Sequence, residues 1–329
     1  MHLFLKRSWL TVVFSTIYTF SIDAQVYSNK TTLPQPIIFG EGIISTADYE
    51  THPGFSPSGD TLYFLKCLAD ANFCTICVSY HRASKWTMPQ VASFSGQYND
   101  ADPFVTKDGK TIYFVSNRPL QEGGTAKEDW DIWKVERNAT GWSKPTHLDS
   151  PISSGASEYF PTLADNGNLY FGSSREGGKG KSDIYLSKFI NGKYTDPVNL
   201  GDSINTADNE YEPFIAIDES YMIFMATKPD GIAHADFFIS YNIKGKWSKV
   251  EKLGGPINSA ATEWGGKGTR DGKYFFFGSS RNKIDNRLPQ RESTQQYEKR
   301  LNSAGNGLGD IYQVDISALH LKSPHSLKM

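Results

Sequence analysis

Hydrophobic residues in this chain occur in short runs separated by Asx-Gly turns, and helix-type periodicity is almost absent. The stretch Glu158–Tyr185 shows the unit: a strand, a turn at Asn166-Gly167, a second strand, a glycine-rich loop, and a third strand that begins at Asp183. Asx-Gly pairs supply the positive φ that tight hairpin turns require. The pattern therefore predicts antiparallel strands joined by tight turns.

Versions of this unit occur five times, and internal repetition of this kind predicts a fold before any single residue does. Each first strand is anchored by a proline or glycine, at Pro53, Pro103, Pro161, Pro213 and Gly266. The third strands are expected to begin at Thr75, Asp131, Asp183, Asp236 and Asp310. A fourth strand, opened by an aromatic residue, follows in the first four copies, at Trp86, Trp142, Tyr194 and Trp247.

The fifth copy lacks a fourth strand, and the N-terminal segment can supply it. Residues 36–48 match residues 197–208 of the third copy closely. Closing the ring in this way removes exposed sheet edges. We therefore predict an all-β fold, a five-bladed β-propeller of four-stranded blades over residues 36–317. Residues 25–35 would be a short N-terminal segment and residues 318–329 a C-terminal tail.

Several motifs resemble the TolB-type propeller repeats of bacterial envelope proteins. They are Ser56–Phe64, Ser-Ser-Arg at 173–175 and 279–281, and Asp-Ile-Tyr at 183–185 and 310–312. The resemblance extends over nearly all of residues 36–316 and implies a propeller. It implies no single activity, because the family ranges from protein-docking modules to enzymes.

Residues 283–308 interrupt the repeat by lengthening the loop between the second and third strands of the last blade. Within them, residues 290–301 can form a short helix. Loops of this length are usually functional or disordered. The sequence leaves open a lid at the rim of the ring and an unstructured insertion.

The N-terminus has the pattern of a secretory signal over residues 1–24. Lys6 and Arg7 precede an apolar run from Trp9 to Phe20, and Ala24 is a small residue at the expected cleavage site. An uncleaved anchor is the alternative. No other stretch is long and apolar enough to predict a transmembrane segment. We expect an exported protein, periplasmic or secreted.

Composition changes this picture little. The 20 Phe, 17 Tyr and 7 Trp residues favour strands, and a net charge of −2 argues against nucleic acid as a partner. Cys67, Cys74 and Cys77 lie close together. We expect a disulfide across one hairpin between Cys67 and Cys74, while a metal site lacks further ligands and free thiols remain an alternative.

Three polar positions recur at the end of the ring where the first strands begin. The residue three before the anchor is acidic in every copy: Glu50, Asp100, Glu158, Glu210 and Glu263. The second strand ends in a cation at Arg118, Arg175, Lys228 and Arg281, but in Leu68 in the first copy. The third strand begins with Asp except at Thr75. Repetition favours an architectural role, so the first blade should lack its structural ion pair.

Residues at which one copy differs from the others favour a functional role, because functional sites are where local sequence rules are broken. The residue before the anchor is Phe160 or Gly265 in two copies but His52, Asp102 and Glu212 in the others. Two residues before the anchor stand Tyr159, Tyr211 and Trp264, and His234 lies near the head of a third strand.

Aromatic and arginine side chains at the mouth of a ring suit an acidic oligosaccharide or glycan, because Arg pairs with carboxylates and aromatic rings stack on sugars. If chemistry occurs, β-elimination at a uronate by a lyase or dehydratase fits best, with His52, Tyr159 or Tyr211 as the base. The expected substrate-binding residues are Arg118, Arg175, Arg281, Trp264, Glu212, Asp102 and His234.

This chemistry is similar to that of oligogalacturonate lyases, whose His-rich metal site is not visible here, and the sequence does not decide whether a divalent cation takes part. A non-catalytic propeller that binds envelope proteins or glycans is the main alternative, and a glycosidase using Asp102 and Glu212 is another. An enzyme should show a pocket with His52, an aromatic residue and an unpaired Arg, whereas a binding module should show paired arginines and a flat face.

Overall fold

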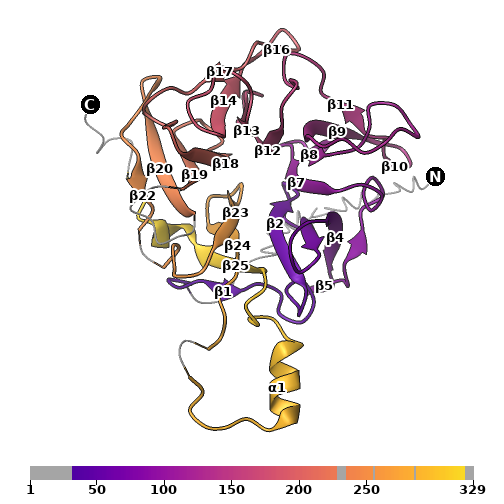
Figure 1. The fold of residues 1–329 in the computed structure, drawn as a ribbon, viewed down its shortest axis with the longest axis vertical. Helices are drawn as coiled ribbons and strands as arrows, with labels where there is room; N and C mark the ends of the chain where they lie inside the picture. The colour runs from indigo at the N-terminus through magenta and orange to yellow at the C-terminus, as the bar shows by residue number, and fades with distance from the viewer. Residues whose placement is uncertain (1–31, 228–234, 255, 285–286, 323–329) are drawn as a thin grey trace, which may run out of the picture.

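The computed structural model describes residues 32–227, 235–254, 256–284 and 287–322. Its strands form five antiparallel blades in a ring (Figure 1), which confirms the predicted propeller. The strand nearest the centre comes first in each blade: β2 (Tyr49–Phe55), β7 (Asp100–Val105), β12 (Glu158–Leu163), β18 (Asn209–Ile215) and β23 (Glu263–Gly268).

The middle strands of each blade follow after a tight turn. The second strands are β3 (Thr61–Cys67), β8 (Thr111–Ser116), β13 (Leu169–Ser173), β19 (Tyr221–Thr227) and β24 (Tyr274–Ser279). The third strands are β4 (Cys74–Arg82), β9 (Asp131–Asn138), β14 (Asp183–Ser187), β20 (Asp236–Ile243) and β25 (Asp310–Asp315). Only the first-copy start differs from the prediction, at Cys74 instead of Thr75, because Cys74 already pairs with Cys67.

The outer part of a blade is short and often split in two. Its pieces are β5 (Lys85–Trp86), β6 (Gln90–Val91), β10 (Gly141–Trp142), β11 (Thr146–His147), β16 (Lys193–Tyr194), β17 (Val198–Asn199), β21 (Lys246–Trp247) and β22 (Glu251–Lys252). In the third blade β15 (Phe189–Ile190) continues the direction of β14 and pairs with β16. In the last blade this place is taken by β1 (Ile37–Ile38), which pairs antiparallel with β25. The N-terminal strand therefore completes the blade that contains the C-terminal strand.

The core lies within and between the blades. Strand β24 is buried at every position, as expected for a strand covered on both faces. Its Phe275 packs edge-on against Phe237 of the preceding blade, with ring centroids 5.7 Å apart. On its other side Phe276 contacts Phe55 of the first blade. Aromatic contacts of this kind hold neighbouring blades together.

Every innermost strand has a bulge at the same place, just before the anchor. The bulged residues have left-handed φ values of 51 to 57°: His52, Asp102, Phe160, Glu212 and Gly265. This conformation is unfavourable for residues with a Cβ. Because all five blades share it, the bulge belongs to the architecture, and it brings these five residues into mutual contact at the centre of the ring.

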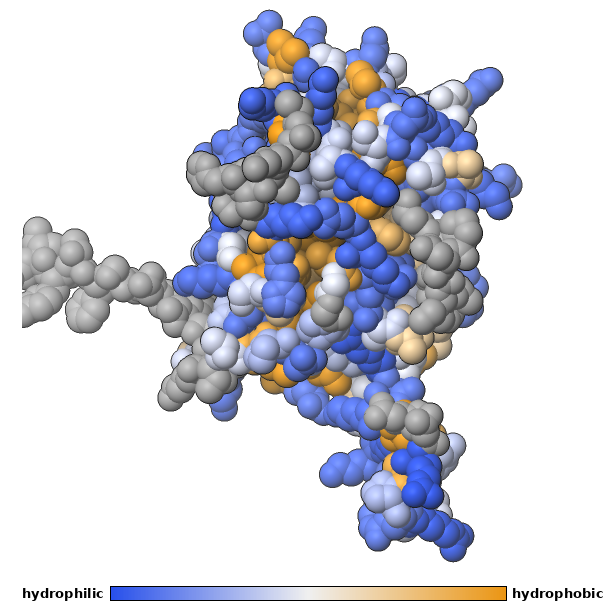
Figure 2. Space-filling view, turned by 90° about the vertical axis from the view of Figure 1, so that its left-hand side faces the viewer, coloured by the Kyte–Doolittle hydropathy of each residue, from blue (hydrophilic) through white to orange (hydrophobic). Residues whose placement is uncertain are grey.

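The insertion forms an arm that points away from the propeller (Figures 1 and 2). Its helix α1 (Thr294–Leu301) begins at a capping box formed by Ser293 and Gln296, and none of its residues is buried. After β25 the chain makes a 3-10 turn, η1 (Ile316–Leu319). Figure 2 also shows an apolar area bordered by hydrophilic side chains on the side of the ring that it presents.

A disulfide joins Cys67 and Cys74, which face each other across β3 and β4. Cys77 is a buried free thiol, and burial raises its pKa to about 11. The predicted signal segment, residues 1–24, lies outside the described residues. In the part of the chain that the structure describes, no helix is long and apolar enough to cross a membrane.

Candidate functional site

The ring has two faces that differ in chemistry. On the entry face the innermost strands begin, and the repeated acids lie there. Each acid accepts a hydrogen bond from a serine or threonine four or five residues earlier; for example, Ser154 Oγ donates to Glu158 at 2.5 Å and Thr206 Oγ1 to Glu210 at 2.6 Å. These contacts close the loop that leads into each blade.

The arginines of the entry face are paired within their own blades. Arg118 lies 2.6 Å from Asp100, Arg175 lies 3.1 Å from Glu158, and Arg281 lies 3.3 Å from Glu263. Each guanidinium also lies over aromatic rings of the second and third strands of its blade. Within the described residues, none of their hydrogen bonds reaches His52, Tyr159 or Tyr211.

The first blade does not lack its ion pair, contrary to the sequence prediction. Lys66, one pair inward from the end of β3, lies directly opposite Glu50 and 3.0 Å from it. A second carboxylate, that of Asp48, lies 2.7 Å from the same amine. Comparison of the copies did not indicate that Lys66 replaces the arginine, because Lys66 lies two residues before the position that the arginine has in the other blades.

At the centre of the ring, His52 meets two carboxylates from other blades. Its Nε2 lies 3.3 Å from Glu212 and 3.5 Å from Asp102. The two acids are also held by backbone amides, since Phe160 N–H donates to Asp102 at 3.2 Å and Gly265 N–H donates to Glu212. All three ionisable side chains are buried.

Burial and mutual charge shift the pKa values of this cluster. Burial opposes the charging of His52, but Glu212 and Asp102 outweigh it and raise the His52 pKa above its ordinary value. Burial raises the pKa of Asp102 to about 6, against the opposing effect of His52. Perturbed groups of this kind occur at functional sites and in structural ion-pair networks alike.

The entry face leaves almost no space around His52. Phe160 stacks on the imidazole at 5.7 Å and contacts both Tyr159 and Tyr211, while Trp264 packs against Tyr49 farther out. The remaining cavity has a volume of about 10 Å³, enough for about one water molecule. Burial raises the pKa of Tyr211 to about 12, which makes it a weaker acid. His234 lies outside the described residues.

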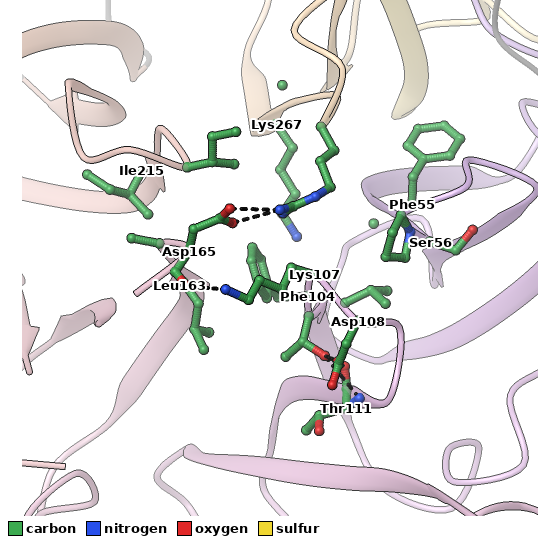
Figure 3. A pocket seen from close by; sticks show the side chains of 18 of the residues that line it. Phe55, Ser56, Phe104, Lys107, Asp108, Thr111, Leu163, Asp165, Ile215 and Lys267 are labelled. Atoms are coloured by element: carbon green, nitrogen blue, oxygen red, sulfur yellow. Dashed lines mark hydrogen bonds and ion pairs between the residues drawn. The ribbon is translucent and has the colours of Figure 1, made fainter. Parts of the chain in front are cut away.

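The substantial cavity lies at the opposite end of the ring, on the turn face, where tight turns join the first and second strands. It has a volume of about 420 Å³ (Figure 3). Its walls are largely apolar and include Phe55, Phe104, Leu163, Phe189 and Ile217. Phe189 and Ile217 are each 43% exposed, although both are large hydrophobic residues.

Cations surround this turn-face cavity. One guanidinium nitrogen of Arg270 contacts both carboxylate oxygens of Asp165, at 2.8 and 2.9 Å. Lys107 Nζ donates to the Asp165 carbonyl at 2.5 Å (Figure 3). Among the described residues, the other guanidinium nitrogens of Arg270 have no acceptor. Three cations and two carboxylates, those of Asp108 and Asp165, line the cavity.

The third cation, Lys267, connects the cavity to the charged cluster. It lines both the cavity and the small space around His52. Its amine crosses from the last blade to the second and donates to the Pro103 carbonyl at 2.6 Å. Burial lowers the pKa of Lys267 to about 8, although Asp102 and Glu212 oppose this shift.

A sequence signal for this cavity lies at two repeat positions after the anchor, which the predicted set of acids and arginines does not include. The residues one after the anchor are Gly54, Phe104, Thr162, Phe214 and Lys267, and those four after it are Pro57, Lys107, Asp165, Ile217 and Arg270. Both positions vary in chemistry from copy to copy, as the residues before the anchor do. Among the described residues, no group of three or more His, Cys, Asp or Glu side chains is arranged to hold a metal ion.

Comparison with known proteins adds no functional assignment. No protein-family model matches the sequence, and no curated protein does. Among solved structures, the chain is similar to a protein of Agrobacterium tumefaciens assigned provisionally as TolB, at 14% identity and a TM-score of 0.46, over 82% of this chain and 90% of that one.

Two further structures are comparably distant. An α-L-arabinofuranosidase from Lactobacillus brevis is 14% identical, with a TM-score of 0.47 over 82% of this chain and 95% of that one. A Hadza microbial sialidase is 14% identical, with a TM-score of 0.41 over 70% of this chain and 53% of that one. At this similarity they say nothing about the activity, and the ring of blades itself is what agrees with the resemblance to TolB-type repeats.

Proposed function

We propose that this protein is an exported propeller that binds an acidic oligosaccharide in the turn-face cavity. One observation carries the proposal. A cavity of about 420 Å³ with aromatic walls has Arg270 at its rim, and among the described residues only one guanidinium nitrogen of Arg270 has an acceptor. Cavities of about 300–1,000 Å³ with mostly apolar walls and a few polar groups are typical ligand sites.

The chemistry of the walls favours a sugar that carries a carboxylate. The rings of Phe55, Phe104 and Phe189 offer apolar surface to the faces of sugar rings. Arg270 pairs with the Asp165 carboxylate, whereas Lys107 donates to the Asp165 backbone carbonyl. The three cations that line the cavity exceed its two carboxylates by one positive charge, which favours an anionic ligand. The disulfide between Cys67 and Cys74 supports export, because such bonds persist in oxidising compartments.

Elimination at a uronate is the second candidate function, and the position of Lys267 supports it. The space around His52 is too small for a sugar, which argues against His52 as a base that acts from the entry face. Lys267 faces the turn-face cavity with a lowered pKa, and a neutral amine there can remove a proton beside a carboxylate that Arg270 neutralises.

Isothermal titration calorimetry with uronate oligosaccharides and with neutral oligosaccharides of the same length tests the binding. We expect heat only with the acidic series, and about a tenfold or greater loss of affinity in Arg270→Gln, because a charge-assisted hydrogen bond is removed. Arg300→Gln is the matched control, since Arg300 pairs with Glu292 on the projecting arm.

Equal affinity for neutral and acidic sugars, or equal loss in both variants, would contradict the proposal. The same samples report on elimination through the absorbance of an unsaturated uronate. Product that disappears in Lys267→Met would make the protein a lyase or dehydratase, and absence of product from every uronate tested would leave it a binding module.

A further inference from the structure

Lys267 is placed unlike any other residue at its repeat position. The four equivalent residues are Gly54, Phe104, Thr162 and Phe214, so only the last blade has a charged side chain at this repeat position. The amine spans from β23 to Pro103 on β7, 164 residues away in sequence. Gly54 makes room there, because a Cβ at Gly54 would lie 2.4 Å from the Pro103 carbonyl oxygen.

The amine has no direct counter-ion among the described residues, and its only hydrogen-bond acceptor there is the Pro103 carbonyl. The nearest acids, Asp102 and Glu212, are already engaged with His52 and with backbone amides. A lysine without a paired carboxylate in a low-dielectric site loses its proton readily. The neutral amine that results is a nucleophile toward carbonyl groups.

We propose that Lys267 is a carbonyl-reactive amine that captures the aldehyde or keto group of a small acidic ligand in the turn-face cavity as a Schiff base. This inference uses the same cavity as the proposed function but does not require a uronate. The carboxylate of the ligand would be held by Arg270 and Lys107 at the rim, and its carbonyl carbon would reach Lys267 below them.

The step balances without any oxidant or reductant. The lone pair of the neutral amine attacks the carbonyl carbon, and a proton moves from nitrogen to oxygen to give a carbinolamine. Protonation of the hydroxyl group releases one water molecule as the C=N bond forms. Solvent in the turn-face cavity can supply that proton.

Reductive trapping tests the inference directly. The intact protein is incubated with glyoxylate, an aldehyde that carries a carboxylate, together with cyanoborohydride, and every lysine is then mapped by peptide mass spectrometry. We expect carboxymethylation of Lys267 at least about tenfold faster than at exposed lysines near pH 7.5, because a far larger fraction of its amine is neutral. The labelling rate of Lys267 should rise through a midpoint near pH 8.

Controls separate this inference from the proposed function. Acetaldehyde, which lacks the carboxylate, should label Lys267 less selectively, and Arg270→Gln should reduce the preference for glyoxylate. Labelling of Lys267 no faster than that of exposed lysines, or with the pH midpoint of an ordinary lysine, would overturn the inference in the wild-type protein, whether or not Lys267→Met folds. Selective labelling without protection by uronate oligosaccharides would uphold it and count against the proposed function.

Discussion

Replacing Arg118 with methionine distinguishes an architectural arginine from one that binds ligand. Arg118 lies 2.6 Å from Asp100, also donates to the Phe94 carbonyl at 3.1 Å, and is covered by Phe114 and Trp133. Asp100 is fully buried, so the substitution would leave an uncompensated charge in the core. Removing one partner of a buried ion pair costs about 3–5 kcal/mol.

For a domain of this size, such a loss lowers the melting temperature by roughly 2–4 °C per kcal/mol, or about 10 °C in all. Urea unfolding of the wild type, Arg118→Met, Asp100→Asn and the double variant gives the coupling energy of the pair. The double variant should be more stable than the sum of the single losses predicts. Calorimetry on folded Arg118→Met should show unchanged affinity for uronate oligosaccharides.

A near-normal melting temperature combined with lost oligosaccharide binding would refute this interpretation. Arg118 would then be a ligand-binding residue, as its place at the mouth of the ring first suggested. Arg175 and Arg281 have the same surroundings in their own blades, so the outcome would apply to them as well.

Two further predictions concern stability. Asp310 Oδ1 has no partner among the described residues, and burial raises its pKa to about 7, with Glu50, Glu41 and Lys283 nearby. The folded state therefore holds this proton more tightly than the unfolded chain, and the free energy of unfolding should fall between about pH 4 and 7, by at most roughly 4 kcal/mol. Asp310→Asn should flatten that slope in urea titrations, and an unchanged slope would contradict the assignment. Gly265→Ala should lose about 2–4 kcal/mol, because φ is +57° and the new Cβ would lie 2.8 Å from His52, whereas Gly201→Ala, at φ +77° in open space, should lose about 1–2 kcal/mol. Equal losses in thermal unfolding would show that the contact with His52 costs nothing.

The charged cluster at the centre of the ring could be placed from sequence, but the turn-face cavity could not. The comparison of copies identified His52, Asp102 and Glu212 as departures, and the structure brings these three together. It could not show that Phe160 covers the histidine, because Phe160 approaches from another blade, more than a hundred residues later. The same limit hid Lys267, whose acceptor lies 164 residues away.

The sequence by itself determined the ring of blades. Each blade is built from local strands and tight turns, three of which are Asx-Gly pairs, and the match between residues 36–48 and 197–208 is enough to predict closure by the N-terminal strand. Only the tertiary structure decided which end of the ring is hollow. Side chains just before the anchors fill the centre on the entry face, whereas those after the anchors leave about 420 Å³ on the turn face. That difference depends on volumes and charges meeting across the ring from different blades, which no local pattern encodes.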